Sequence, residues 1–372
     1  MKTLPNEILD VFYKYLNFDD LYSFTFMKKN NIMLNNFNNL KEQIKKQNYK
    51  NLLFIEAVKN NQYILLKYLI FLKVNYCNDG LKIAAGLNDF KMVNFLILNG
   101  KNDYDTAMAH AAKNNHMDMV KYMISKGANN WNSALTSAAG NNHMEMVNYM
   151  ISKGADYWDV AMSLAASNNH MEMVEYLISL GANDWNWAMV DAAQNNHKEM
   201  VKYMIEKGAD IWNDAMVNAA ENNHKEMVDF LISKGATDWD NAMVNAAQNN
   251  HKEMVDFLIS KGATDWDNAM ANASSNNNKE MVNFIIQKGA NNFDLAMVYA
   301  AHNNHIELVN FFILKGANKW NYAMAYAAKN NHIDLVKFFI KKGANDFNKA
   351  MAYATGNNHG EMVEFLNSQK NK

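Results

Sequence analysis

Apolar and polar positions along this chain follow a pattern that predicts pairs of short helices. Residues 186–212 show the pattern once. Small apolar residues recur there at helical spacing, which places them on one face of a helix: Ala188, Met189, Ala192 and Ala193. After an interruption at Asn-Asn-His, residues 199–207 carry a second apolar set: Met200, Val201, Tyr203, Met204 and Ile205. We therefore predict two short helices joined by a turn.

Polar residues and a glycine predict where these helices begin and end. Asn186 follows Trp185 and precedes the first helix, and its side chain can accept hydrogen bonds from the free N–H groups of a first turn. Gly208 follows the second helix, where a left-handed residue is favoured. We expect Asn186 to cap the first helix, and the same role for the matching Asn and Asp residues elsewhere: Asp105, Asn132, Asp159 and Asp240.

The whole pattern repeats every 27 residues. Glycines recur at this interval from Gly100 to Gly343, and histidines from His116 to His359, with Asn278 in place of one histidine. A fixed period of this kind indicates a repeat array. We predict an all-α fold: an α-solenoid of about twelve stacked helix pairs over residues 50–372, preceded by a small helical segment in residues 1–49.

Composition excludes several function classes. The net charge is −2 and no arginine occurs, so neither nucleic acid nor an anionic membrane is an expected partner. Cys77 is the only cysteine, which rules out an intrachain disulfide and favours a reducing compartment. The most apolar stretch, residues 63–74, is too short to span a bilayer. We expect a location in the cytoplasm, which would be that of the host cell if the protein is viral, with the nucleus as an alternative.

The repeat unit resembles a known family. The stretch 197–210, which begins His-Lys-Glu-Met-Val and ends Lys-Gly-Ala-Asp, resembles the second (outer) helix and glycine turn of ankyrin repeats. The Ala-Met-x-x-Ala-Ala motif at Ala188 is similar to their first (inner) helix, and the resemblance covers roughly residues 50–366. Ankyrin repeats have about 33 residues, whereas these have 27. The missing residues lie where the family places a β-hairpin finger, so we expect helix pairs without such fingers.

A second resemblance covers the N-terminus. Residues 1 to about 31 are similar to the start of an F-box, with matching positions at Leu4, Pro5, Glu7, Ile8, Leu9, Phe12, Leu16 and Leu21. This resemblance implies binding to a Skp-type adaptor of cullin-RING ubiquitin ligases. The later part of the F-box pattern is not clear in residues 28–34. An F-box-like segment followed by short ankyrin units is similar to proteins encoded by large DNA viruses of amoebae.

Two positions of the repeat unit, which we call the histidine column and the aromatic column, each allow a chemical and a structural explanation. The histidines could hold a metal, but no Cys, Asp or second His joins each one at ligand spacing, so hydrogen bonds to backbone in the turn between the helices are favoured. The aromatic column could stack on single-stranded nucleic acid, but without a basic groove we favour packing in the core. It consists of Tyr104, Trp131, Trp158, Trp185, Trp212, Trp239, Trp266, Phe293, Trp320 and Phe347.

A partner should bind where the repeats differ. The first, fifth and eighth residues after the Asn186-type position share one face of each first helix, which we call the variable stripe. The stripe is polar in the middle of the array and aromatic and basic near the C-terminus, where tyrosines suit a protein interface. We predict a partner site there, the C-terminal patch: Leu295, Tyr299, His302, Tyr322, Tyr326, Lys329, Lys349 and Tyr353. Alternatively these rings only cover the end of the array. A smaller candidate is Val160, Leu164 and Trp187.

These observations predict a non-enzymatic protein that binds another protein, without a cofactor or a metal. In one hypothesis the N-terminus binds a ubiquitin-ligase adaptor and the array captures a target for it. In the alternative the chain is an interaction scaffold or decoy, and residues 1–49 only cap the array. We expect a monomer.

Overall fold

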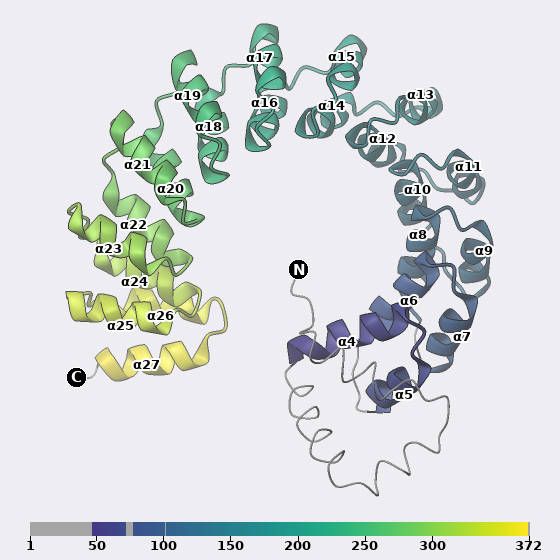
Figure 1. Ribbon diagram of the computed structural model, residues 1–372, viewed down its shortest axis with the longest axis horizontal. Coiled ribbons are helices and arrows are strands. Elements are labelled where there is room, and N and C mark those ends of the chain that lie inside the picture. Colours follow the sequence, from purple (N-terminus) through teal and green to yellow (C-terminus); the bar gives the residue numbers. More distant parts are fainter. Residues whose placement is uncertain (1–46, 72–76, 101, 371–372) are drawn as a thin grey trace, which may run out of the picture. The chain divides into compact units, whose positions relative to one another are not determined.

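The structure is a computed structural model that describes residues 47–71, 77–100 and 102–370. Within these ranges it contains 24 helices and no strand. The helices form pairs, in which an even-numbered first helix is followed by an odd-numbered second helix (Figure 1). The first helices are α4 (Gln47–Lys59), α6 (Cys77–Gly86), α8 (Tyr104–Lys113), α10 (Trp131–Ala139), α12 (Trp158–Ser167), α14 (Trp185–Gln194), α16 (Trp212–Glu221), α18 (Trp239–Gln248), α20 (Trp266–Ser275), α22 (Phe293–His302), α24 (Trp320–Lys329) and α26 (Phe347–Thr355).

The second helices follow the same period. They are α5 (Tyr63–Phe71), α7 (Phe90–Leu98), α9 (Met117–Ser125), α11 (Met144–Ser152), α13 (Met171–Leu180), α15 (Lys198–Lys207), α17 (Lys225–Lys234), α19 (Lys252–Lys261), α21 (Lys279–Lys288), α23 (Ile306–Leu314), α25 (Ile333–Lys342) and α27 (Gly360–Lys370). The predicted α-solenoid of about twelve helix pairs is therefore confirmed. No β-hairpin finger interrupts the described pairs.

The chain divides into two compact units. One contains the described residues up to Ala165 together with His170–Asn183, and the other contains Ala166–Asn169 together with the chain from Asp184 onward. In the first unit, successive first helices pack from α4 to α10, and in the second unit they pack from α14 to α26 (Figure 1). Each unit thus builds its core by repeating one helix-on-helix contact.

Small apolar residues make this contact possible. Ala188, Met189, Ala192 and Ala193 of α14 are all fully buried, as the helical spacing predicts. Alanine lets two helices approach closely, because no bulky side chain separates their backbones. The second helix contributes Met200, Val201 and Met204, which are also fully buried. Every described pair therefore depends on its neighbours for much of its core, as expected for repeat proteins.

The aromatic column packs at the start of each first helix. From Tyr104 to Phe347 its members are half-buried, and the Nε1 atoms of five tryptophans from Trp158 to Trp266 are buried. The ring of Trp266 lies against Gly289, which ends the second helix of the same pair. This arrangement confirms the packing explanation and leaves no exposed ladder of rings for nucleic acid.

The predicted caps were placed on the wrong residue. The side chain of Asp184, two residues before Asn186, accepts from the Trp187 N–H at the start of α14. Asn186 lies inside the helix and accepts instead from the N–H groups of Asp210 and Ile211, which precede α16. The same correction holds for Asp105, Asn132, Asp159 and Asp240, each of which accepts from backbone ahead of the next first helix.

Candidate protein-binding site

The C-terminal patch lies on three successive first helices of the second unit. Leu295, Tyr299 and His302 are on α22, Tyr322, Tyr326 and Lys329 on α24, and Lys349 and Tyr353 on α26. Tyr322 is 50% exposed, and the other members are half-buried. The buried alanine stripe fixes the opposite face of each helix, so these residues are held at the surface by the helix period.

The aromatic rings of the patch contact one another across the three helices. The centroids of His302 and Tyr326 are 5.9 Å apart with an edge-on geometry, and those of Tyr326 and Tyr353 are 5.4 Å apart. Such contacts are favourable beyond the area that they bury. Burial, together with the phenol of Tyr353, raises the pKa of the Tyr326 hydroxyl above its usual value. The phenol therefore stays neutral and can donate a hydrogen bond at physiological pH.

Two lysines of the patch lie over tyrosine rings. The Nζ atom of Lys349 is 3.4 Å from the centroid of the Tyr322 ring, and Nζ of Lys329 is 5.9 Å from that of Tyr326. A cation over an exposed ring is held by about 0.5–1 kcal/mol. The rings thus orient two positive charges on the same surface.

His302 is held as a neutral ring by the next repeat. The side-chain amide of Asn330 donates to the backbone oxygen of His302 at 2.7 Å and lies 2.9 Å from its Nδ1. Since an amide nitrogen only donates, Nδ1 accepts and the ring proton is on Nε2. Burial and the neighbouring Lys329 and His332 lower the pKa of His302 below its usual value. The histidine therefore adds a hydrogen-bonding ring to the patch rather than a third charge.

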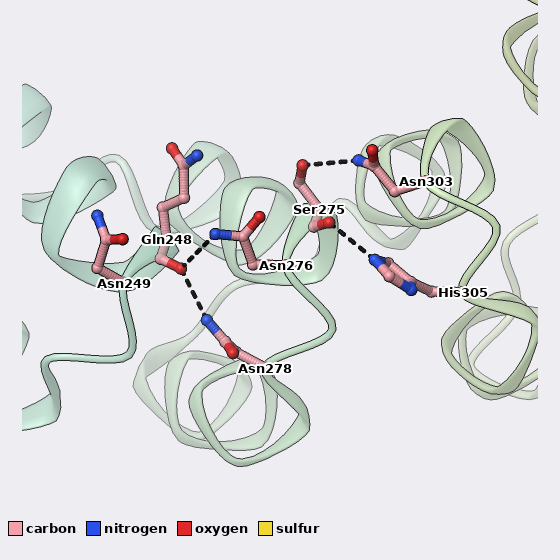
Figure 2. A pocket seen from close by; sticks show the side chains of 7 residues that line it. All are labelled: Gln248, Asn249, Ser275, Asn276, Asn278, Asn303 and His305. Atoms are coloured by element: carbon pink, nitrogen blue, oxygen red, sulfur yellow. Dashed lines mark hydrogen bonds between the residues drawn. The ribbon is translucent and has the colours of Figure 1, made fainter. Parts of the chain in front are cut away.

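A polar hollow of about 550 Å³ lies beside the patch, at the ends of α18, α20 and α22 (Figure 2). Its amides already bond within the protein. Asn276 and Asn278 both donate to the backbone oxygen of Gln248, at 3.0 and 2.7 Å, and Asn303 donates to Ser275 Oγ at 2.8 Å. The lining consists of Gln248, Asn249, Ser275, Asn276, Asn278, Asn303 and His305. The lining contains no Asp, Glu, Lys or Arg, so we assign the hollow a structural role.

The histidine column ties neighbouring repeats together. The Nε2 atom of His251 lies 2.9 Å from the backbone oxygen of Glu221, at the end of the preceding first helix, and Asn278 uses its side-chain amide in the same way. The expected hydrogen bonds to backbone are confirmed, but the acceptor is the last residue of the preceding repeat's first helix and not a residue of the turn. Because a carbonyl only accepts, Nε2 must carry a proton and cannot bind a metal there. The same bond is made by His116, His143, His197, His224, His305, His332 and His359.

Other candidate residues belong to other helices or lie outside the described residues. Val160 and Leu164 are exposed on α12 in the first unit, and Trp187 is exposed on α14 in the second. The eight F-box-like positions, from Leu4 to Leu21, lie outside the described residues. In the part of the chain that the structure describes, no three His, Cys, Asp or Glu side chains form a group that could hold a metal ion.

Comparison with known families decides the class of the protein. A family model for ankyrin repeats in three copies matches residues 81–161, 157–215, 216–295 and 297–372. The chain belongs to the ankyrin-repeat family. Ankyrin repeats indicate a protein–protein interaction module, and the members of this family are generally binding proteins rather than enzymes.

Other comparisons add little to this assignment. The ankyrin-repeat domain of human ASB11 is similar to the chain at 22% sequence identity, over 42% of this chain and 84% of that one, with a TM-score of 0.32. No curated protein matches the chain. Among the described helices of this ankyrin-repeat protein, none combines the length and apolar character needed to cross a membrane.

Proposed function

We propose that this ankyrin-repeat protein captures a target protein on the C-terminal patch. The observation that carries the proposal is the contact of His302, Tyr326 and Tyr353 across three helices, on the face that the core leaves free. Tyrosine is common at binding hot spots, because it offers a rigid apolar ring with a polar tip. The equivalent positions on α18 and α20 are Asn245 and Asn272, which lack such rings.

The alternative is that the rings only cover the last repeats. They do pack on one another, but Tyr322 remains 50% exposed. A ring that only covers the end of the array would be expected to pack against it, whereas an exposed ring can contact a partner. This difference favours a binding surface, and a mutational test can separate the two roles.

The test compares matched substitutions on the variable stripe. We expect Tyr326→Ala with Tyr353→Ala to weaken target capture in a crosslinking pull-down from the native cells by about tenfold or more, since each anchor contributes about 1–2 kcal/mol. Asn245→Ala with Asn272→Ala, at the same stripe position, is the control and should capture normally. Equal capture by both double variants, with unchanged thermal unfolding, would rule out the patch.

We further propose that residues 1–31 link the captured target to a ubiquitin ligase. Support comes from the sequence, where Leu4, Pro5 and Leu9 match the start of an F-box. The purified chain should then retain a Skp-type adaptor, and Leu4→Ala with Leu9→Ala should lose it without affecting target capture. If the unmodified chain does not retain the adaptor, the function is that of an interaction scaffold or decoy.

A further inference from the structure

The charge of the variable stripe reverses along the second unit. At its first and eighth positions, α16 carries Asp214 and Glu221, both exposed. The same positions are uncharged on α18 and α20: Asn241, Gln248, Asn268 and Ser275. On the C-terminal patch they carry Lys329 and Lys349, and the patch contains no carboxylate. One protein face therefore runs from acidic to basic over six consecutive first helices.

The two patch lysines have no acidic partner among the described residues. Lysines on the second helices do form ion pairs, such as Lys261 with Asp229 and Lys288 with Asp256. Lys329 and Lys349 lie over rings instead. A ring face stabilises a positive charge only weakly, so each lysine ammonium group can still form an ion pair with a carboxylate of a bound partner.

We infer that the partner of the C-terminal patch presents an acidic segment of protein chain, whose carboxylates pair with Lys329 and Lys349 while an apolar residue lies on the tyrosines. This inference rests on the proposed function and narrows it to one class of partner. The acidic stripe at Asp214 and Glu221 repels such a segment and directs it to α22–α26.

Nucleic acid is a poorer fit to the same surface. The patch has two lysines and no arginine, whereas phosphate backbones are bound by several cations together. The rings also contact one another, which leaves less room for a base to stack between them. A protein segment needs only carboxylates and one apolar side chain to match the two lysines and the tyrosines.

The experiment selects peptides from a random phage-display library on the immobilised full-length chain. Selected peptides should be enriched in Asp and Glu together with an apolar residue, and should fail to bind the Tyr326→Ala, Tyr353→Ala variant. Lys329→Met and Lys349→Met keep the aliphatic stems over the rings and should each weaken binding about two- to fivefold, more at low than at high salt. Lys315→Met is the control, because Lys315 also lies near a ring, that of Phe311, but directly follows the second helix α23 and is outside the variable stripe.

Each outcome separates this inference from the function on which it rests. Selected peptides could depend on the tyrosines but lack acidic residues and bind both lysine variants with unchanged affinity. That result would overturn the inference without contradicting the proposed function. Peptides that bind regardless of the tyrosines would overturn both. Labelled oligo-dT or poly-U could instead bind more tightly than any selected peptide, in a salt-dependent way. That result would overturn the inference and identify nucleic acid as the partner. Circular dichroism confirms that each variant is folded.

Discussion

Two residues adopt a left-handed backbone in the ten repeats whose second helix ends at a glycine, and each explains one feature of the sequence. An asparagine in the turn between the two helices has φ near 60° in every described helix pair, as at Asn196 with φ 62°. Asparagine tolerates this conformation better than most side chains. The glycine that ends the second helix has φ above 100° in most repeats, as at Gly208 with φ 115°. At this position a side chain is strained whatever space surrounds it.

Substitution of two of these glycines should separate backbone strain from crowding. At Gly316, with φ 104°, an added Cβ would meet nothing within 4 Å, whereas at Gly289, with φ 123°, it would lie 2.7 Å from the Trp266 ring. We expect Gly316→Ala to lower the free energy of unfolding by about 1 kcal/mol. Gly289→Ala should cost at least about 1 kcal/mol more, because the indole must move. Urea unfolding measures both, and equal losses would show that the ring yields freely.

At the scale of helices, a side chain of one repeat holds the backbone of the next. The Asp240 carboxylate on α18 accepts from the N–H groups of Thr264 and Asp265, at 2.6 and 2.9 Å, just before α20 begins. These N–H groups precede a helix and would otherwise lack a partner within the protein. We call this contact the Asx clamp. It sets the register of each first helix on its neighbour, together with the histidine bond at the other end of the helix.

Removal of one clamp should weaken the contact between two repeats. We expect Asp240→Ala to lower the free energy of unfolding by about 1–2 kcal/mol, because two backbone donors lose their acceptor. Asp240→Asn should stay within about 0.5 kcal/mol of the unmodified chain, since Asn213 and Asn321 make the same contact elsewhere. Chemical unfolding of both variants tests this, and a full loss in Asp240→Asn would show that the negative charge matters more than the acceptor.

The Asx clamp also shows which part of the fold could not be predicted from the sequence, namely the residue that caps each first helix. The helix pairs and the glycine turns followed from the period of 27, since a helix face and a left-handed turn are local properties. The cap did not, because Asp184 and Asn186 flank Trp185 and both types of side chain can cap. One signal was available: the cap position is Ile211 in one repeat and Lys319 in another, whereas the Asn186-type position is Asn or Asp throughout.

The candidate site was predicted only in part. Its residues followed from the helix period, which places Tyr299, Tyr326 and Tyr353 on equivalent positions. The contacts between the rings, and the position of Lys349 over the Tyr322 ring, depend on the distance between neighbouring helices. The sequence alone does not give this distance. The neutral state of His302 depends on Asn330, a residue that the sequence marks only as part of a turn.

At the scale of the molecule, each unit is a series of nearly equal contacts between neighbours. Residues 213–239 and 240–266 differ at only three positions, so α16 and α18 present almost the same surfaces. In such an array, stability is close to a sum of repeat and interface contributions. The C-terminal patch lies on α22–α26 and shares no residue with these two repeats. Its binding should therefore be independent of residues 240–266, whose variable stripe is uncharged.

Deletion of residues 240–266 tests this independence. The deletion joins Trp239 to Asp267, which reproduces the Trp266–Asp267 junction. Asn213 still accepts from the N–H groups of Thr237 and Asp238. We expect the shortened chain to fold, with less helical signal in circular dichroism and a smaller dependence of unfolding on urea, in proportion to the lost surface. Affinity for an acidic peptide selected on the full chain should change by less than about twofold. Loss of that affinity in a chain that still unfolds cooperatively would mean that the middle repeats are part of the binding surface.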